Sequence, residues 1–416
     1  KQNLKSIKMY KEITKCRISS STNLIDVLSL GNQYLTGVFP KKRDEKVTIG
    51  PVDLVWCPES GLLQMKQSYS LEEMYGDNYG YRSGLNTKMI NHLRDKVAKI
   101  CREVELSAGD VVIDVGSNDG TSLGAYPDHL KLVGVDPTAG KFRRYYKDHI
   151  IVVEDFFSAK NLIDVVGNQK AKVITSHSMM YDLDDPITFA KDVREALAEN
   201  GIWVFEQSYM PTMLERIAFD TICHEHIEYY GLAQIEWILG KAGLKAIDVQ
   251  FNDTNGGSFS VTATPLENEL RAVNQSIIDT RKSEIELGLD TLIPYQKFAD
   301  TTKNRAHELK EFINNQVSNG KVIRGVGAST KGNCLLQFAG LTSSEVLSIA
   351  EINEDKFGCV TPGSKIPIQD QSDVLALKND YLLVLPWHFR DFFLTSPLFV
   401  GQTLLFPLPA LEVINR

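Results

Sequence analysis

Between residues 86 and 265, short apolar runs rich in β-branched residues alternate with segments of helical spacing. After a helix at residues 89–104, this pattern predicts parallel strands at 111–115, 132–136, 150–153, 172–175 and 201–206. A hairpin-like pair follows at residues 244–249 and 258–263. Such alternation predicts an α/β fold, with ligands bound where the parallel strands end.

The flanking segments have other patterns. Residues 1–85 are irregular, with short apolar runs at 24–28 and 52–56. The polar stretch from residue 267 to 319 has a helical period and predicts one buried face, made by Leu270, Val273, Ile277 and Ile278. Strand-like runs then restart at 321–327, 346–350, 381–385 and 402–406. We therefore predict three domains, at residues 1–85, 86–265 and 266–416, the last being a second, smaller α/β unit.

The first glycine turn has the chemistry of a nucleoside pocket. The sequence G-S-N-D-G follows strand 111–115, and Asp136 ends the next strand, where a carboxylate can hold both ribose hydroxyls. A dinucleotide would require G-x-G-x-x-G, and here Asp119 puts a negative charge where a phosphate would lie. A negative turn favours a cationic ligand such as S-adenosylmethionine, with its sulfonium and ammonium groups. The alternative is a βαβ unit with an ordinary tight turn. The turn residues are Gly116, Ser117, Asn118, Asp119 and Gly120.

A second glycine turn, G-V-G-A-S-T-K-G-N at residues 325–333, also follows a predicted strand. It is neither a complete dinucleotide fingerprint, because Thr330 replaces the third glycine, nor a P-loop. Free N–H groups at a helix start, hydroxyls and a lysine suit a diphosphate; a purely structural turn is the alternative. Together with an aromatic plate and a guanidinium after strand 381–385, the expected contacts of a nucleoside diphosphate are Ser329, Lys331, Asn333, Trp387, His388 and Arg390.

Residues 219–230 hold the densest group of reactive side chains, centred on His224, Glu225 and His226. They follow the last parallel strand and are expected at the same sheet edge as the first glycine turn. One imidazole can act as a general base while the carboxylate fixes its tautomer. A structural polar turn is the alternative. A zincin motif is excluded, because H-E-x-x-H would need histidine at Glu228.

Composition limits the classes of function. A chain of 416 residues exceeds one ordinary core, and its net charge of −8 argues against nucleic acid as the main partner. No apolar run is long enough to span a bilayer, and the first residues lack the apolar core of a signal peptide. Six scattered cysteines do not suggest a disulfide framework. We expect a cytoplasmic protein without a membrane partner; the sequence does not indicate its oligomeric state.

With these motifs in view, the chain resembles the sugar C-methyltransferases that act on nucleotide-linked 4-keto-deoxysugars. The resemblance covers essentially the whole chain, and its matching stretches are residues 112–120, 219–230, 255–258, 327–333, 356–368 and 385–390. It implies a small zinc-binding N-terminal domain, a Rossmann-like class I methyltransferase domain that binds S-adenosylmethionine, and a Rossmann-like C-terminal domain that binds the nucleotide sugar.

The resemblance also implies a reaction. A proton leaves the carbon beside the C4 ketone, with C3 favoured over C5, and the enolate carbon attacks the sulfonium methyl. The position matching the family's base is His226, with Glu225 beside it. Tyr79 and Tyr81 match a family tyrosine stretch that could donate to the enolate or order the cofactor. Core or hinge packing is the alternative for these tyrosines.

For the cofactor, the resemblance implies that the first glycine turn faces the methionine end. The remaining expected contacts, to the ribose, the adenine and the mouth of the cleft, are Tyr79, Asp136, Pro137, Asp155, Phe156 and Ser176. Core packing is the alternative for Phe156.

Two departures from the family pattern stand out. The places of two C-x-x-C pairs read C-R-I-S at 16–19 and C-P-E-S at 57–60, so each pair has lost one cysteine. Two thiolates do not fill a tetrahedral zinc site, and we expect no zinc. Cys223 stands where many members have tyrosine, which leaves any share of that tyrosine in the proton transfer to His224, Tyr181 or another group. A Cys223/His226 metal pair stays open, as do a sugar O-methyltransferase and an NAD(P)-dependent nucleotide-sugar enzyme.

Overall fold

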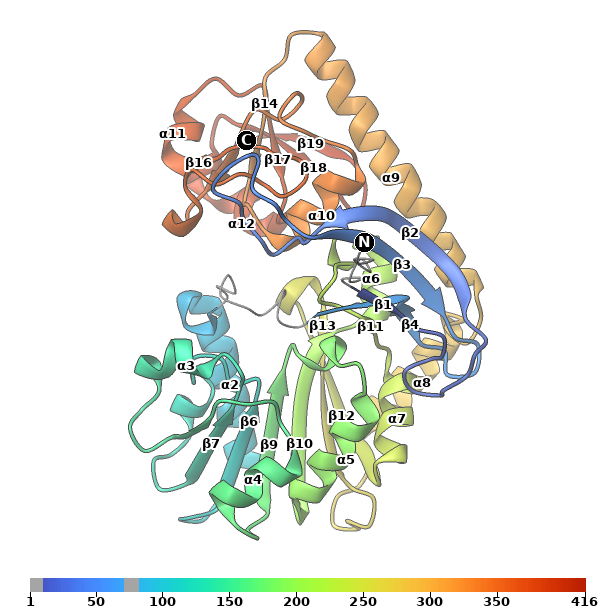
Figure 1. Cartoon of the computed structure of the whole chain (residues 1–416), viewed down its shortest axis with the longest axis vertical. Coiled ribbons are helices and arrows are strands. Elements are labelled where there is room, and N and C mark those ends of the chain that lie inside the picture. The colour runs from blue at the N-terminus through green and yellow to red at the C-terminus, as the bar shows by residue number, and fades with distance from the viewer. Residues whose placement is uncertain (1–9, 71–81) are drawn as a thin grey trace, which may run out of the picture.

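The computed structural model describes residues 10–70 and 82–416. Its largest element is a seven-stranded sheet of order β12-β13-β10-β9-β6-β7-β8, in which only β13 runs antiparallel to its neighbours. Figure 1 shows it in the lower half of the molecule. The strands are β6 (Val111–Val115), β7 (Lys131–Val135), β8 (Ile151–Val153), β9 (Ala171–His177), β10 (Leu197–Ser208), β12 (Leu244–Asn252) and β13 (Ser258–Pro265).

Helices cover both faces of this sheet, which explains why its strands are continuous apolar runs: all five residues of β6 are buried. Two hydrophobic cores result, one on each face. The predicted strands of this region are confirmed, with ends that shift by a few residues. The helices are α2 (Thr87–Glu103), α3 (Ala139–Phe142), α4 (Ala159–Val166), α5 (Pro186–Ala196), α6 (Met210–Glu215) and α7 (Leu232–Lys241).

The C-terminal region forms a six-stranded sheet of order β16-β15-β14-β17-β18-β19, parallel except for its last strand. This is the Rossmann order, in which the strand sequence reverses between the first and fourth strands. The predicted α/β class is therefore confirmed for this region too. Its elements are β14 (Ile323–Val326), α10 (Thr330–Phe338), β15 (Ile349–Glu351), β16 (Ile368–Asp370), α11 (Gln371–Ala376), β17 (Tyr381–Val384), α12 (Arg390–Thr395), β18 (Thr403–Phe406) and β19 (Glu412–Asn415).

The sequence predicted an irregular N-terminal segment, and this prediction is wrong. The segment forms a four-stranded antiparallel sheet of order β11-β4-β3-β2. Bulges between β2 and β3 break the alternation that would have revealed them. Strand β11 (Glu228–Tyr229) comes from far along the chain, directly after His226. The other strands are β1 (Tyr10–Glu12) and β5 (Gln67–Tyr69), which pair with each other, and β2 (Ile25–Tyr34), β3 (Ile49–Trp56) and β4 (Leu63–Met65).

Two helices connect the large sheets, α8 (Gln275–Glu286) and the long α9 (Ile293–Ser318), which runs along β2 (Figure 1). The predicted buried face is wrong for three of its four residues. Leu270 is 89% exposed and Val273 and Ile278 are also exposed, whereas Ile277 is buried. Leu270 and Val273 precede the start of α8, so helical spacing does not apply to them. Among the described residues, no helix combines the length and hydropathy needed to cross a membrane.

Candidate functional site

The carboxyl edges of the two large sheets are joined by side-chain contacts. Lys331, in the first turn of α10, donates from Nζ to the main-chain oxygen of Asn255 at 2.6 Å. Trp387, after β17, donates from Nε1 to Asp220 Oδ2 at 2.8 Å. The loops after β14 and β17 flank the point where the strand order of the C-terminal sheet reverses, the usual position of a ligand crevice. The two loops therefore contact segments that leave the seven-stranded sheet at its own carboxyl edge.

His226 lies at this junction with a defined tautomer. Its Nδ1 is 2.9 Å from the main-chain oxygen of Thr221. A carbonyl can only accept, so the proton lies on Nδ1 and Nε2 has the free lone pair. The ring of Tyr181 stands edge-on to the imidazole, with centroids 4.4 Å apart. Burial lowers the pKa of His226, and the charge of Glu225 opposes that shift. The imidazole is therefore neutral near pH 7, as a general base must be.

Glu225 lies where three segments of the chain meet. A Cβ atom added to Gly37, in the loop after β2, would lie 3.0 Å from Glu225 Oε1 and 4.0 Å from Thr330 Oγ1. The carboxylate is thus close to both the N-terminal domain and the start of α10. Its Oε2 is buried without a hydrogen-bond partner among the described residues. This oxygen therefore has acceptor capacity that the described residues do not use.

His224 has different surroundings. It is fully buried, and its ring stands edge-on to Tyr69 of β5 at a centroid distance of 4.7 Å. Burial lowers the pKa of His224, and the charge of Glu225 and the nearby backbone groups of Gln33 and Gly50 oppose that shift. The two histidines of H-E-H therefore pack in different places, His224 against the N-terminal segment and His226 against Tyr181.

The first glycine turn has the conformation that its sequence predicts. Gly116 and Gly120 have φ angles of +72° and +75°, which disfavour any residue with a side chain. A Cβ on Gly120 would also lie 2.7 Å from the Tyr146 ring. Ser117 turns inward, with its hydroxyl 2.8 Å from the Tyr146 hydroxyl. The turn therefore offers its backbone, rather than the Ser117 side chain, to a ligand.

Carboxylates around this turn are bound mainly to backbone N–H groups. Asp136 accepts from Asn118 N on Oδ2 at 2.8 Å and from Thr138 on Oδ1. Because Oδ2 has a single protein partner, it can accept a ribose hydroxyl as well. Asp119 Oδ2 accepts from Gly84 N at 2.8 Å, and Asn118 Oδ1 from Ser83 N at 3.0 Å. The linker, residues 82–86 just before α2, thus contacts the glycine turn. Tyr79 and Tyr81, which precede it in the sequence, lie outside the described residues.

The expected adenine contacts divide into accessible and buried residues. Phe156 is 54% exposed just beyond β8, so core packing does not explain it. Asp155 Oδ2 accepts from Asn161 Nδ2 at 3.0 Å, and Pro137 is exposed. Ser176 is instead buried, and its hydroxyl accepts from Trp203 Nε1 at 3.0 Å. The structure therefore holds Ser176 within the sheet rather than at an accessible mouth.

The expected diphosphate contacts also differ among themselves. Ser329 caps α10 by accepting from Gly332 N at 3.0 Å, and the fully buried Asn333 donates to Thr36 O at 2.7 Å. Arg390 forms a bidentate ion pair with Glu412 of β19, both Nη2 bonds being 2.8 Å long. His388 has a pKa of about 3 because burial and the nearby Lys331 disfavour its charged form. Lys331 and His388 both lie against Gly256, between β12 and β13 of the seven-stranded sheet, and Trp387 is bonded to Asp220 in the segment before His226.

Three buried acids were missed in the sequence. Glu206, at the carboxyl end of β10, accepts from Asn252 Nδ2 at 2.7 Å and lies 2.6 Å from both His92 Nε2 and Lys96 Nζ. Burial opposes its ionisation, but His92 and Lys96 lower the pKa to about 2. Glu351 is likewise a buried acid at the carboxyl end of a strand, β15. The strand-end rule that found Asp136 would have found both.

The third acid, Glu228, shares a cavity with the base. This space of about 10 Å³, lined by Tyr181, His226 and Glu228 among others, is large enough for about one water molecule. Burial raises the pKa of Glu228 to about 8, although Arg17 and Tyr230 lower it in part. Its Oε1 is buried without a protein partner in the segments described. A neutral carboxylic acid thus lies next to His226, and no short motif marks it.

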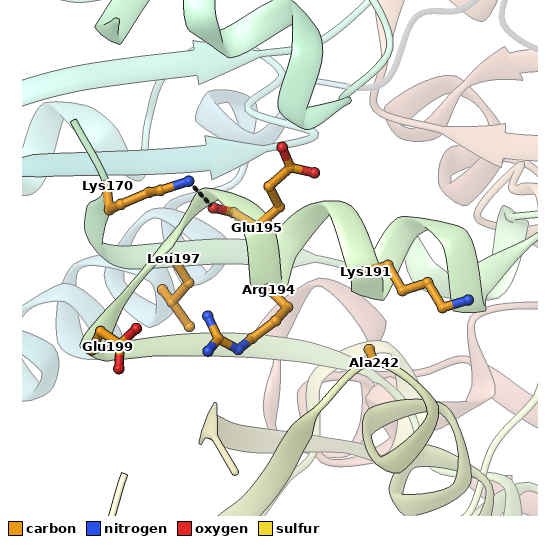
Figure 2. Close-up of a pocket in the computed structure, with 7 residues that line it drawn as sticks. All are labelled: Lys170, Lys191, Arg194, Glu195, Leu197, Glu199 and Ala242. Carbon is orange, nitrogen blue, oxygen red and sulfur yellow. Dashed lines mark hydrogen bonds between the residues drawn. The ribbon is translucent and has the colours of Figure 1, made fainter. Parts of the chain in front are cut away.

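A larger hollow, of about 420 Å³, lies elsewhere (Figure 2). Its lining includes Lys170, Leu197 and residues at the end of α5, beside the points where β9 and β10 begin. Ligands of parallel sheets bind at the opposite, carboxyl ends of the strands. This hollow is therefore not the candidate active site.

Comparisons with known proteins agree with this architecture. Three family models match in order along the chain: "Putative zinc binding domain" at residues 16–75, "Methyltransferase domain" at 85–249 and "C-methyltransferase C-terminal domain" at 253–409. The curated C-methyltransferase NovU of Streptomyces niveus is 27% identical over 412 residues, which are 97% of this chain and 97% of NovU.

Solved structures resemble parts of the chain. An S-adenosylmethionine-dependent methyltransferase from Clostridium acetobutylicum is 16% identical with a TM-score of 0.33, covering 42% of this chain and 92% of its own. The N-methyltransferase NodS of Bradyrhizobium japonicum is 13% identical with a TM-score of 0.33, covering 44% of this chain and 99% of its own. Similarity at this level does not bear on the chemistry of the site.

Proposed function

The chain is an S-adenosylmethionine-dependent methyltransferase with the domain composition of the C-methyltransferases, and from this premise we propose its substrate and mechanism. The substrate is a nucleotide-linked 4-keto-6-deoxysugar, and the methyl group goes to the carbon beside the ketone, with C3 favoured. The observation that carries this proposal is the position of His226. A neutral imidazole with a fixed tautomer lies where the carboxyl edges of the two large sheets meet.

In the proposed mechanism, His226 Nε2 removes the proton from the sugar carbon. The charge of Glu225 supports the imidazolium that forms. A proton beside a ketone is too weakly acidic for a bare imidazole, so the enolate oxygen needs preorganised donors. We assign one of these to the Tyr181 hydroxyl, because its ring packs on His226, and give His224 a packing role against Tyr69. When bound, S-adenosylmethionine would supply a methyl group on a positively charged sulfur. Transfer of that methyl group to the enolate carbon would break the S–CH3 bond, release S-adenosylhomocysteine and restore the ketone.

The described residues fit this cofactor. The left-handed Gly116 and Gly120 allow close backbone approach, and Asp136 Oδ2 has capacity for a ribose hydroxyl. The exposed Phe156 provides a face for the adenine, beside Asp155. We propose these residues, with the backbone of the turn, as the cofactor site. Tyr79 and Tyr81 remain proposed contacts from the adjoining linker, and the three-domain division at residues 85 and 265 also remains a proposal.

For the nucleotide sugar, we propose Lys331 and His388 as the main polar contacts, with Trp387 holding Asp220. Lys331 reaches the methyltransferase domain at Asn255, so a diphosphate bound to its Nζ would place the sugar toward His226. Ser329 and Asn333 position the start of α10, and Arg390 is retained by Glu412. The specificity for one nucleotide or sugar is not assigned.

The proposal is tested by incubating the enzyme with S-adenosylmethionine and a panel of nucleotide-linked 4-keto-6-deoxyhexoses in deuterated water. We expect deuterium exchange at the carbon beside the ketone, and mass spectrometry and NMR should place the new methyl group on that carbon. A methyl group found only on oxygen, without exchange, would instead establish a sugar O-methyltransferase.

The NAD(P)-dependent alternative is disfavoured by the second glycine turn, in which Thr330 replaces the third glycine of a dinucleotide fingerprint. Glu351 does not separate the alternatives. Its carboxylate accepts from Ala328 N at 2.9 Å, as that of Asp136 accepts from Asn118 N, and an acid at the end of the second strand can also hold the ribose of NAD. Titration with each cofactor separates the two readings, since a true ligand raises the melting temperature.

A further inference from the structure

Two turns in the N-terminal domain, residues 16–21 and 57–62, have the same hydrogen-bond pattern. In each, the cysteine oxygen accepts from the N–H four residues on: Ser20 N to Cys16 O at 2.9 Å, and Gly61 N to Cys57 O at 2.8 Å. In each, the cysteine N–H donates to the oxygen five residues on, at 2.8 and 3.0 Å. The fourth residue after each cysteine is left-handed, with φ of +61° at Ser20 and +68° at Gly61.

The serines of these turns are equivalent as well. Ser19 Oγ accepts from Ser21 N, and Ser60 Oγ accepts from Leu62 N, both at 3.3 Å. Each serine hydroxyl also reaches across to the cysteine of the other turn. Cys16 Sγ is 3.3 Å from Ser60 Oγ, and Cys57 Sγ is 3.4 Å from Ser19 Oγ. Four side chains from two equivalent turns therefore converge on one point, as the ligands of a tetrahedral metal would.

The residues present do not fit zinc. A structural zinc site needs four cysteine or histidine ligands in most proteins, and this point offers two thiols and two hydroxyls. Within the described segments, no group of three or more cysteine, histidine, aspartate or glutamate residues is placed to hold a metal. The cysteines are nearly or fully buried, at 2% and 0% exposure, and neither forms a disulfide.

We propose that these turns are a metal-free form of a zinc site, in which two reciprocal thiol–hydroxyl hydrogen bonds join them in place of the ion. We name Cys16, Ser19, Cys57 and Ser60 the Cys–Ser tetrad. Thiol and hydroxyl groups can each donate and accept, so the tetrad satisfies its own polar atoms without a charge.

The tetrad also supports the catalytic segment. Ile18 O and Ser60 O accept from Trp237 Nε1 and Gln234 Nε2, which fastens both turns to α7. Arg17, between the tetrad residues, donates to Met65 O at 2.7 Å, next to the pairing of β4 with β11. Because β11 begins two residues after His226, a metal-independent tetrad makes the position of the base independent of zinc supply.

The first experiment replaces both cysteines in the full-length chain, Cys16→Ser/Cys57→Ser. Serine can keep both cross-turn hydrogen bonds, so we expect a folded protein with methyl transfer within about threefold of wild type and no zinc in either protein by metal analysis. Loss of folding in this variant while Ser19→Ala/Ser60→Ala remains stable would overturn the proposal, as would about one tightly bound zinc per wild-type chain. We expect the alanine pair to lower Tm by about 2–4 °C per bond lost.

The second experiment restores the lost ligands, Ser19→Cys/Ser60→Cys, under reducing conditions with added zinc. We expect about one zinc per chain, with Zn–S distances of about 2.3 Å by X-ray absorption. The control, Ser20→Cys/Glu59→Cys, adds two cysteines at exposed positions of the same turns and should hold no stoichiometric zinc. A folded restored variant that binds no more zinc than this control would show that the four side chains do not form a metal geometry.

Discussion

The Nδ1 atom of His226 lies 2.9 Å from the main-chain oxygen of Thr221. The peptide oxygen fixes the proton on Nδ1. The tautomer therefore does not depend on the neighbouring Glu225, although the sequence had suggested that this carboxylate would fix it. Glu225 is left to act through its charge, and one of its oxygens has no protein partner among the residues described. This division of roles makes the histidine testable by a substitution that keeps the Thr221 contact.

We expect His226→Asn to abolish both deuterium exchange and methylation. The asparagine amide can donate to Thr221 O in place of Nδ1, while the basic Nε2 is removed. A positioned general base contributes about 10²–10⁴-fold, so kcat should fall by at least that factor. Isothermal titration should show unchanged affinity for S-adenosylmethionine.

The matched control is His224→Phe. Because His224 packs edge-on to Tyr69, apart from the contact between His226 and Tyr181, a phenyl ring should replace it with little loss of activity. If the folded His224→Phe protein were inactive and His226→Asn active, the base would have been assigned to the wrong histidine.

Tyr181→Phe tests the proposed donor to the enolate oxygen. The substitution retains the ring that packs on His226 and removes only the hydroxyl. Removing one donor of this kind costs about 10²–10³-fold in kcat, so exchange and methylation should both slow by that factor with little change in KM. Tyr145→Phe, at a 41% exposed tyrosine, is the control and should retain full activity. Wild-type exchange rates in Tyr181→Phe would assign the donor elsewhere.

The sequence predicted the two large sheets well because both of their faces are buried. Strands such as β6 are then continuous apolar runs that stand out from the helices around them. The N-terminal sheet was missed for the opposite reasons. Its strands contain bulges, and its last strand, β11, is two residues long and lies more than 150 positions from its partner β4.

The strand-end rule predicted a candidate site at the carboxyl edges of the two sheets, and it could not show which of these side chains are already bonded to other parts of the protein. Arg390 is paired with Glu412, and Ser176 accepts from Trp203, partners that no local motif reveals. The packing of His224 and His226 in different places likewise depends on Tyr69 and Tyr181, which come from distant elements. Short motifs therefore predict a region, whereas tertiary contacts distinguish the residues within it.

Phe156→Ala should weaken the binding of S-adenosylmethionine without destabilising the protein. The side chain is 54% exposed, so its loss leaves no cavity in a core. Stacking of a base on an aromatic ring contributes about 1–3 kcal/mol, which predicts a Kd at least about 5-fold higher by titration calorimetry. Phe251→Ala, at a 53% exposed residue of β12, is the control and should leave Kd unchanged. Equal Kd values for Phe156→Ala and wild type would remove Phe156 from the adenine site.

The last prediction concerns Glu228 and the pH dependence of stability. Burial raises its pKa in the folded protein to about 8, from an ordinary value of 4.5. Between these values the folded state holds a proton that the unfolded state has released. The contribution of Glu228 to the free energy of unfolding is therefore complete below pH 4.5 and is lost as the pH rises toward 8, by at most about 1.4 kcal/mol per pH unit.

Glu228→Gln has no such proton to lose and can still accept from the Tyr230 hydroxyl. Its Tm should fall less steeply than that of wild type when thermal unfolding is measured from pH 5 to 8. Glu345→Gln gives a control of opposite sign, because hydrogen bonds from Lys310 and Thr342 outweigh burial and lower the pKa of Glu345. The stability due to Glu345 is present above the ordinary pKa of 4.5 and is lost only as the pH falls below it, so this variant should keep the wild-type slope between pH 5 and 8. Parallel slopes for Glu228→Gln and wild type would mean that Glu228 is ionised in the folded protein, and the cavity beside His226 would then hold a charged carboxylate rather than a neutral acid.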